Sequence, residues 1–352
     1  MTKKKILIAT GGTGGHVFPA YSLAKNLLKK NLSVEILTDK RGLKYLKKYE
    51  DLNLILNNSA TIFAGNIFKR IWSFFVIICS FFKSLLILSK KKPFVVFGMG
   101  GYSSFPVCIA SKILGIPFII YENNLFLGKS NKYLLPYAYK LFVSYSEVEG
   151  IEEKYRDKLV DVGNIIREEI LNSKLDYTPL NENTLSILIL GGSQAAKSFG
   201  DQLPEIFKTC VLDGMKLRIY QQCIQSQSNK LQEFYKSLKI DFELFSFTDN
   251  LLKYFSKIDL VITRSGSSIT AELLNCNIPF ICIPYPYAAD NHQEKNALYF
   301  KNQEFSFLVK ENEIQYKLFP LIKQIYKDKK ILKQISDKQK KYLNKKKIKK
   351  KK

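Results

Sequence analysis

Short apolar runs alternate with amphipathic segments from end to end of this chain, and no other sequence feature limits the fold as strongly. Such alternation is typical of parallel sheets covered by helices. In the first half, the runs expected to form strands are Lys4–Thr10, Ser33–Leu37, Leu52–Leu56, Phe94–Gly98, Pro117–Tyr121 and Lys140–Ser144. In the second half, they are Ser186–Leu190, Lys216–Gln221, Phe242–Ser246, Leu260–Thr263, Pro279–Pro284 and Phe305–Val309.

The two halves also echo each other in detail. KILIATGGTGG begins the first half and SILILGGSQ the second, and VVFGMGGYSS and LVITRSGSS repeat the scheme later in each. The length of 352 residues suits two cores. We therefore predict an α/β protein of two Rossmann-like, doubly wound parallel-sheet domains that bind ligands at the carboxyl ends of their strands. The expected domains are residues 1–163 and 164–337, followed by a disordered Lys-rich tail at 338–352.

The chain carries 55 Lys and Arg against 31 Asp and Glu, a formal net charge of +24. This excess favours polyanionic partners such as phosphates, nucleic acid or an acidic membrane surface. The six cysteines lack CxxC spacing and most lie in apolar runs, which indicates small buried side chains and neither a zinc site nor a disulfide framework. The first strand begins too early to leave room for a signal peptide, so we expect the protein to stay in the cytoplasm.

The stretch Ile71–Ser89 is apolar and long enough to raise a membrane-spanning helix, with basic residues on both sides. Against a span, Lys83 and serines lie inside it, and strands and helices continue to alternate on either side. Two other interpretations stay open. One is a buried core helix, and the other is a helix with one face in the core and one at the membrane interface.

The glycine-rich segment Gly11–His16 follows a strand and precedes a helical pattern, so its N–H groups are suited to an anion or polar ligand. It is not the dinucleotide fingerprint, because Val17 occupies the third glycine position and Asp39 does not compensate for it. A lone histidine is more often structural than catalytic. The place of His16 at a strand end, where ligands bind in this fold class, favours a catalytic role.

Two further glycine-rich turns follow strands. Gly98–Ser104 is either a pyrophosphate-binding turn or a tight turn alone. Gly191–Ser198 misses the P-loop pattern at Ala196, which argues against an ATPase or kinase.

The block from Phe247 to Asn296 is the richest in polar groups. Arg264–Thr270 opens a helix with hydroxyls and N–H groups suited to a diphosphate, and Glu272, one turn further on, can accept from ribose hydroxyls. On a solvated helix face, Glu272 would be unremarkable. Asp290–Gln293 forms a dense donor and acceptor set suited to sugar hydroxyls, although a helix cap would explain Asp290 alone.

Taken in order, these motifs resemble those of the MurG family over nearly the whole chain to about residue 300. They are GGTGGHVFPA, GMGGYSSFP, YENN, VGNIIR, GGSQAA, RSGSSITAE and IPYPYAADNHQEKNA. The family has the GT-B fold and transfers N-acetylglucosamine from UDP-N-acetylglucosamine to lipid I, forming lipid II for peptidoglycan synthesis and hence for cell shape and division. The resemblance implies an inverting transferase that needs no cofactor and no metal. It also implies a peripheral protein on the cytoplasmic face of the inner membrane, with anionic phospholipid and other cell-wall synthesis proteins, not nucleic acid, as partners.

The resemblance also implies roles for individual residues. His16 is the candidate base that accepts a proton from the 4-hydroxyl of the acceptor. Phe247 and Thr248 are expected to flank uracil, and His292 and Gln293 to contact the sugar. The residues expected to contact UDP-N-acetylglucosamine are Thr13, Gly14, Gly15, Asn124, Arg167, Ser193, Phe247, Thr248, Ser267, Ser268, Ile269, Thr270, Glu272, His292 and Gln293. The acceptor pyrophosphate is expected at Gly14, Gly15, Gly100, Gly101 and Tyr102, and Thr13, His16 and Asn124 also belong to the acceptor side.

Three motifs depart from the family pattern. Tyr121 stands where the family has a histidine, Ile165 replaces a proline, and Ala196 replaces a glycine. Tyr121 puts in doubt any role for a histidine at its position, and Ala196 stiffens a phosphate loop. Two other readings remain: a related GT-B transferase with another acceptor, and a nucleotide-binding or nucleic-acid-binding protein without catalysis.

Overall fold

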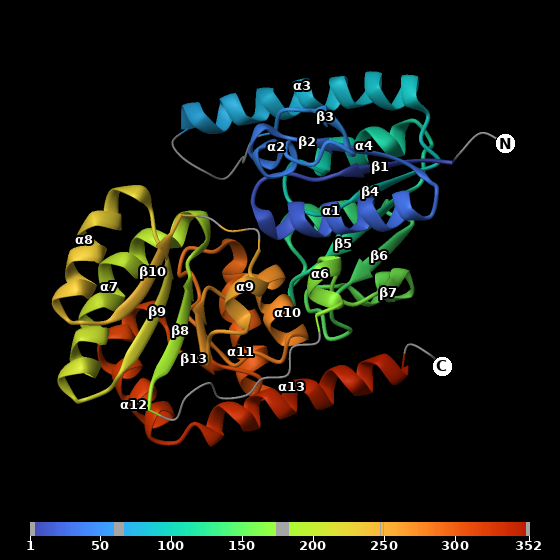
Figure 1. Ribbon diagram of the computed structural model, residues 1–352. Coiled ribbons are helices and arrows are strands. Elements are labelled where there is room, and N and C mark those ends of the chain that lie inside the picture. Colours follow the sequence, from blue (N-terminus) through green and yellow to red (C-terminus); the bar gives the residue numbers. More distant parts are fainter. Residues whose placement is uncertain (1–3, 60–66, 174–182, 247, 249, 350–352) are drawn as a thin grey trace. The chain divides into compact units, whose positions relative to one another are not determined.

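The computed structural model describes residues 4–59, 67–173, 183–246, 248 and 250–349. The chain divides into two compact units, Met1–Glu168 and Glu169–Lys352, so the division lies five residues beyond the expected boundary at 163. Each unit contains a parallel sheet flanked by helices (Figure 1).

The first unit contains a seven-stranded parallel sheet in the order β3-β2-β1-β4-β5-β6-β7. Its strands are β1 (Lys5–Ala9), β2 (Ser33–Thr38), β3 (Asn53–Leu56), β4 (Val95–Gly98), β5 (Phe118–Glu122), β6 (Lys140–Val143) and β7 (Leu159–Asp161). Its helices are α1 (Gly14–Lys29), α2 (Lys40–Leu46), α3 (Ile67–Lys91), α4 (Phe105–Ile113), α5 (Lys129–Leu134) and the 3₁₀ helix η1 (Glu153–Lys158), and α6 (Glu168–Leu171) follows at the division between the units. The short strand β7 was not among the expected ones.

Strand β1 shows why helices must cover both faces of this sheet. Its alternate residues point to opposite faces. Ile6 and Ile8 pack in the cluster that includes α1 and α2, whereas Leu7 and Ala9 pack in the cluster that includes α3, α4 and α5. A strand that is buried on both faces is typical of a doubly wound sheet.

The second unit contains a six-stranded parallel sheet in the equivalent order β10-β9-β8-β11-β12-β13. Its strands are β8 (Leu185–Leu190), β9 (Leu217–Gln222), β10 (Asp241–Phe245), β11 (Leu260–Thr263), β12 (Phe280–Cys282) and β13 (Phe307–Leu308). Its helices are α7 (Gly192–Leu212), α8 (Gln225–Ser237), α9 (Leu252–Phe255), α10 (Ser267–Asn275), α11 (His292–Asn302), α12 (Phe319–Lys327) and α13 (Lys330–Lys349), and the shorter helical turns are η2 (Ala289–Asn291), η3 (Glu311–Glu313) and η4 (Ile314–Leu318).

The expectation about one segment was wrong. Residues 338–349 are the continuation of α13 and not a disordered tail. The side chain of Gln339 is fully buried and donates to the carbonyl oxygens of Ile278 and Phe305, so the helix is attached to the second unit well past residue 337. The cysteines agree with the expectation of buried side chains at five positions, and Cys79, on α3, is exposed.

Helix α3 turns small polar side chains inward and large apolar side chains outward. Ser80 and Ser84 are buried, and the Asn57 amide donates to the carbonyl oxygen of Ser80 and to the Ser84 hydroxyl. Trp72 and Phe75, by contrast, are more than half exposed. By length and composition, Ile71–Lys91 would also be able to cross a membrane, and 17% of its apolar window is buried. The wholly buried core helix is therefore excluded.

Candidate active site

The two glycine-rich turns of the first unit meet at the point where the strand order reverses. Strands β1 and β4 are neighbours, with Ala9 paired to Gly98. The chain leaves β1 towards β2 and leaves β4 towards β5, so a crevice is expected at the carboxyl ends of these two strands. The turns Gly11–His16 and Met99–Ser104 both begin there.

His16 is the last residue of the first turn, and its side chain contacts the second turn. Its Nδ1 is 3.0 Å from the carbonyl oxygen of Met99. A carbonyl oxygen only accepts, so Nδ1 carries the proton in this hydrogen bond, and Nε2 is left with the lone pair that a general base requires. The ring also lies against the second turn, because a Cβ on Gly100 would be 3.0 Å from His16 Nδ1, and Gly100 has a φ of +85°. Only glycine permits both this backbone conformation and this approach.

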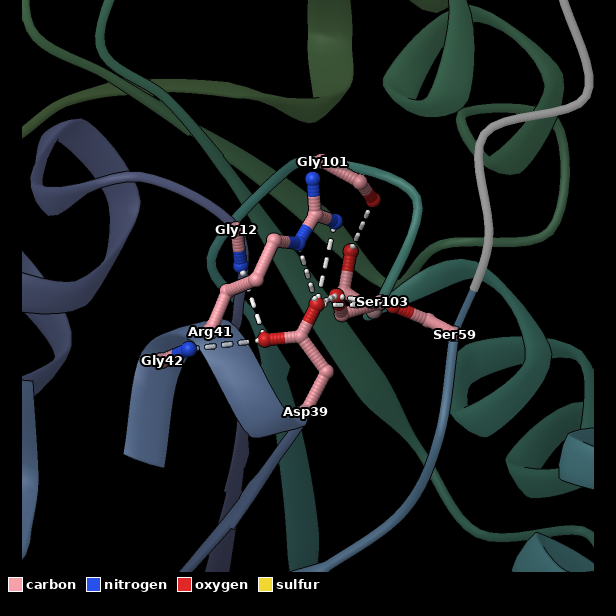
Figure 2. Close-up of polar contacts among 8 residues, drawn as sticks. Gly12, Asp39, Arg41, Gly42, Ser59, Gly101 and Ser103 are labelled. Carbon is pink, nitrogen blue, oxygen red and sulfur yellow. Dashed lines mark hydrogen bonds and ion pairs between the residues drawn. The ribbon is translucent and has the colours of Figure 1, made fainter. Parts of the chain in front are cut away.

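A buried carboxylate, that of Asp39, connects the two glycine-rich turns with Ser59 and with the start of α2 (Figure 2). Its Oδ1 accepts from the backbone N–H groups of Gly12 and Gly42 at 3.0 and 2.8 Å. Its Oδ2 accepts from the hydroxyls of Ser59 and Ser103 and from the Arg41 guanidinium. Burial alone would raise the pKa of Asp39, but the hydrogen bonds from Gly42 and Gly12 and the charge of Arg41 outweigh it, so this pKa lies below its ordinary value.

The lowered pKa makes Asp39 a source of acid sensitivity. A carboxyl whose pKa is lower in the folded protein contributes stability above its unfolded value of about 3.9, and this contribution is lost as pH falls through the folded pKa. We expect Asp39→Asn to reduce the free energy of unfolding at pH 7 and to flatten its decline below about pH 4, as measured by urea denaturation between pH 3 and 7. Asp157→Asn, at an exposed position, is the control. A wild-type decline retained in Asp39→Asn would contradict this assignment.

The YENN motif contributes side chains that brace the same turns. The Asn123 amide donates to the carbonyl oxygen of Gly15 at 2.8 Å. Asn124 donates through its amide and backbone N–H to Glu122. Ser130, at the start of α5, donates to the carbonyl oxygen of Gly101. The structure thus places Asn124 and the turn Gly100–Tyr102 around the loop that carries Thr13, Gly14, Gly15 and His16.

Tyr121 stands where the MurG pattern has a histidine, and it has a structural role here. Its hydroxyl is 2.7 Å from that of Ser144 and accepts from the backbone N–H of Ile165. Burial raises the pKa of Tyr121 to about 12, so the phenol stays protonated. A neutral phenol in this position joins β5 and β6 to the segment Val162–Arg167.

Arg167, expected in the donor site, lies in the first unit. It is buried, and its guanidinium lies over the ring of Phe18 on α1 at 5.4 Å. Thr13, Gly14, Gly15 and Asn124 belong to the same unit, whereas the remaining residues expected at the donor belong to the second.

The second unit repeats the geometry of the first at β8 and β11, which are neighbours with Thr263 paired to Leu190. Helix α10 begins at Ser267, after the cap residue Gly266. The Thr270 hydroxyl donates back to the carbonyl oxygens of Gly266 and Ser267, which fixes the first turn. This turn, with Ser268 and Ile269 half-buried on it, directs N–H groups and the positive end of the helix dipole to the carboxyl edge of the sheet. Glu272 is buried one turn further along.

A buried ion pair, Arg264 with Glu311, holds this loop in place. Arg264 Nη1 is 2.5 Å from Glu311 Oε2 and also donates to the carbonyl oxygens of Ile283 and Pro284. The guanidinium lies 4.5 Å over the ring of Phe199 on α7. Desolvation lowers the pKa of Arg264, and the ion pair with Glu311 opposes this effect. The pair thus joins the end of β11 to the end of β12 and to η3.

The loop from β12 to α11 carries the residues expected to bind the sugar. Asp290 and Asn291 adopt positive φ values of 54° and 53°, a conformation that Asp and Asn tolerate better than most residues. His292 follows as the first residue of α11, and its Nδ1 is 2.6 Å from the carbonyl oxygen of Ala289, so Nε2 is its acceptor nitrogen. The Gln293 side-chain oxygen accepts from the backbone N–H of Tyr285, which leaves its NH₂ group as the donor for a ligand.

The structure gives little information on three of the residues expected in the donor site. Phe247 lies outside the described residues, as does the side chain of Ser193, whose backbone belongs to the first turn of α7. The Thr248 hydroxyl accepts from the backbone N–H of Asn250 at 3.2 Å. Within the described ranges, no group of three or more His, Cys, Asp or Glu residues is placed to hold a metal ion.

Sequence reasoning missed Asp39, Arg41 and Glu311 as site-forming residues. Asp39 was considered only for the dinucleotide fingerprint, and its position at the N-cap of α2 was the available signal. Nothing in the local pattern around Glu311 indicates an ion pair with a residue 47 positions earlier.

Family models match both halves of the chain: the glycosyltransferase family 28 N-terminal domain at residues 6–143 and the C-terminal domain at residues 186–351. A UDP-N-acetylglucosamine--N-acetylmuramyl-(pentapeptide) pyrophosphoryl-undecaprenol N-acetylglucosamine transferase from Pelagibacter ubique (strain HTCC1062) is 36% identical over 317 residues, which is 89% of this chain and 86% of the relative. The protein of the same name from Rickettsia canadensis (strain McKiel) is 35% identical over 88% of this chain and 87% of its own length. The chain belongs to the MurG family of glycosyltransferases.

Solved structures agree on the fold. The crystal structure of Acinetobacter baumannii MurG superposes with a TM-score of 0.75 over 96% of this chain and 95% of that protein, at 24% identity. A glycosyltransferase of kitacinnamycin gives a TM-score of 0.69 at 14% identity, covering 97% and 95% of the two chains. Both confirm the prediction of a GT-B fold with two parallel-sheet α/β domains.

Proposed function

We propose that this chain transfers N-acetylglucosamine from UDP-N-acetylglucosamine to the 4-hydroxyl of the N-acetylmuramoyl group of lipid I, with inversion and without a metal, to form lipid II. The observation that carries the proposal is the pair of ligand-binding edges, one in each unit, at the carboxyl ends of β1 and β4 and of β8 and β11. The names of the curated relatives supply the substrates.

In this reaction, the acceptor oxygen forms a bond to the anomeric carbon while the bond from that carbon to the diphosphate oxygen breaks. The bonding electron pair leaves with UDP, and the acceptor proton passes to Nε2 of His16. The hydrogen bond from Nδ1 to Met99 keeps Nε2 as the basic nitrogen. The first turn of α10 stabilises the negative charge of the leaving UDP through backbone N–H groups and the helix dipole.

The remaining assignments follow from the resemblance to the MurG family. Ser267–Thr270 and Ser193 hold the diphosphate, and the family resemblance assigns Arg167 to the same group. Glu272 accepts from the ribose hydroxyls, and Phe247 and Thr248 flank the uracil. His292 and Gln293 contact the sugar, and the backbone contacts of His292 Nδ1 and of the Gln293 side-chain oxygen support this assignment, because they fix both side chains at the start of α11. On the acceptor side, Thr13, Gly14, Gly15, Asn124 and Gly100–Tyr102 hold the acceptor and its pyrophosphate.

The deciding experiment measures UDP release from UDP-N-acetylglucosamine and a lipid I analogue, with and without EDTA. We expect turnover that needs both substrates and survives EDTA. Glu272→Ala is expected to raise the KM for the donor at least tenfold, while Glu233→Ala, on an exposed position of α8, leaves it unchanged. A folded protein that binds UDP-N-acetylglucosamine but releases no UDP with this acceptor would sink the proposal and favour a GT-B enzyme with another acceptor.

We also propose that the protein is peripheral, on the cytoplasmic face of the inner membrane, with the exposed apolar face of α3 at the anionic lipid interface. Burying a large side chain there contributes roughly 1.5–3 kcal/mol. Trp72→Ser combined with Phe75→Ser is expected to reduce co-sedimentation with anionic vesicles more than tenfold while preserving activity on a water-soluble acceptor. Tyr316→Ser removes an aromatic side chain of similar exposure from the second unit as a control. Equal vesicle binding by all three proteins would exclude α3 as the docking helix.

A further inference from the structure

We infer that Arg41 is a binding residue for the diphosphate of the acceptor, held in position by Asp39. This inference rests on the proposed function, because it requires an acceptor with a diphosphate at the first unit. It adds a cation to a site that otherwise consists of glycine-rich turns.

Arg41 and the turn after β4 contact the same carboxylate, that of Asp39. Its Nε and Nη2 donate to Asp39 Oδ2 at 3.2 and 3.0 Å, and Ser103 donates to the same oxygen at 3.1 Å. Ser103 belongs to the turn after β4, directly beyond the residues expected to hold the pyrophosphate. On the other side, Nη2 lies 3.7 Å from where a Cβ of Gly12 would be. Figure 2 shows the guanidinium and the Ser103 hydroxyl bonded to the Asp39 carboxylate, with the backbone N–H of Gly12 on its other oxygen.

Glycines at the turns allow the side chains of His16, Asp39 and Ser103 to approach the backbone closely. Gly12 has a φ of +81°, and Gly100 and Gly101 have φ values of +85° and +74°. A Cβ on Gly11 would lie 2.3 Å from the Ser103 hydroxyl and 2.9 Å from the Asp39 carboxyl carbon, so only glycine allows the carboxylate to reach both turns. The backbone is therefore shaped around Asp39, and Asp39 in turn directs Arg41.

The two charges of the pair face different surroundings. The Asp39 side chain is 3% exposed, and its two oxygens are surrounded by five donor residues or backbone groups. The Arg41 side chain is 53% exposed. Asp39 takes two of the five N–H donors of the guanidinium, and within the described residues the structure records no acceptor for the others. A diphosphate accepts from such a planar set of donors in pairs.

The alternative is that Arg41 serves only to neutralise Asp39, the residue that caps the start of α2. That function needs no exposed donors, since Gly12, Gly42, Ser59 and Ser103 already bond to the carboxylate. The two roles predict different kinetics. If the role is structural, loss of Arg41 changes the kinetic constants for donor and acceptor together. If Arg41 binds the acceptor, its loss changes only the kcat/KM for the acceptor, and the change depends on the number of phosphates.

The test compares wild type, Arg41→Gln, Arg41→Lys and Lys44→Gln with two acceptor analogues, one with a diphosphate and one with a single phosphate. Lys44 is exposed on the same helix α2, so it controls for loss of one charge. We expect Arg41→Gln to reduce kcat/KM for the diphosphate acceptor about 10- to 100-fold, the effect of one charged hydrogen-bonded contact. The kcat/KM of Arg41→Lys should lie between those of wild type and Arg41→Gln, because lysine keeps the charge without the paired donors. The KM for UDP-N-acetylglucosamine stays unchanged throughout.

With the monophosphate acceptor, the difference between wild type and Arg41→Gln should shrink to less than threefold. An equal loss with both acceptors, a parallel rise in donor KM, or a value for Arg41→Gln that matches Lys44→Gln would each overturn the inference. Absence of turnover by the wild type with either acceptor would instead refute the proposed function, and thermal denaturation of each variant identifies any that has lost its fold.

Discussion

Replacement of His16 by alanine is expected to lower kcat about 10²- to 10⁴-fold, because the acceptor hydroxyl then loses the group that takes its proton. The hydrogen bond from Nδ1 to Met99 supports this role, since in the neutral ring it assigns the proton to Nδ1, and the ring lies against Gly100. The measurement is UDP release at saturating donor and acceptor.

The second histidine provides the matched control. His292 also bonds through Nδ1 to a backbone carbonyl oxygen, but it lies in the second unit at the start of α11. We expect His292→Ala to raise the KM for UDP-N-acetylglucosamine with a much smaller change in kcat, because it removes a contact to the bound sugar. If His16→Ala retained more than a tenth of the wild-type kcat, another group would have to be the base.

Arg264→Met is expected to reduce the free energy of unfolding by about 3–5 kcal/mol, the usual cost of leaving one member of a buried ion pair without its partner. Arg264 is 5% exposed, and in this variant the Glu311 carboxylate loses its counter-ion. The three loops that meet at this pair would loosen with it. Urea denaturation measures the stability, and the KM for UDP-N-acetylglucosamine reports on the loops.

A double substitution separates the effect of the two charges on stability from the effect of side-chain size. Arg264→Met combined with Glu311→Gln removes both charges, so it should recover part of the stability lost in Arg264→Met alone. Lys253→Met is the control, because Lys253 pairs with Glu243 on the surface and such a pair contributes about 0–1 kcal/mol. Additive effects of the two substitutions would show that Arg264 and Glu311 are not energetically coupled.

Much of the fold was predictable because its strongest signals are local. The expected strands differ from the observed ones by only a few residues at either end, since most are short runs rich in apolar residues and flanked by turn residues. Strand β7 (Leu159–Asp161) was missed because it has three residues, too few for a recognisable pattern. The expected tail begins inside α13, because the buried face of this helix, Leu332, Ile335 and Gln339, reaches only one position past residue 338 and the lysines that follow carry no apolar pattern.

Part of the candidate site was likewise predictable from local sequence, and part was not. The glycine-rich turns and the start of α10 lie directly after strands, so the sequence places them at the ligand-binding edge without knowledge of tertiary contacts. The network around Asp39 depends on residues 20 and 64 positions away, Ser59 and Ser103, and no local pattern records such a distance. The tautomer of His16 likewise depends on a carbonyl oxygen 83 positions away.

Helix α13 makes the C-terminal end of the protein responsive to ionic strength. From residue 338 to the end, the sequence has ten lysines and no acidic residue, and Lys341 and Lys345 are spaced one helical turn apart. Each like-charge pair at this spacing costs roughly 0.2–0.5 kcal/mol, and salt weakens the repulsion. We therefore expect the last turns of α13 to be more ordered in concentrated salt or against a polyanion than in dilute buffer.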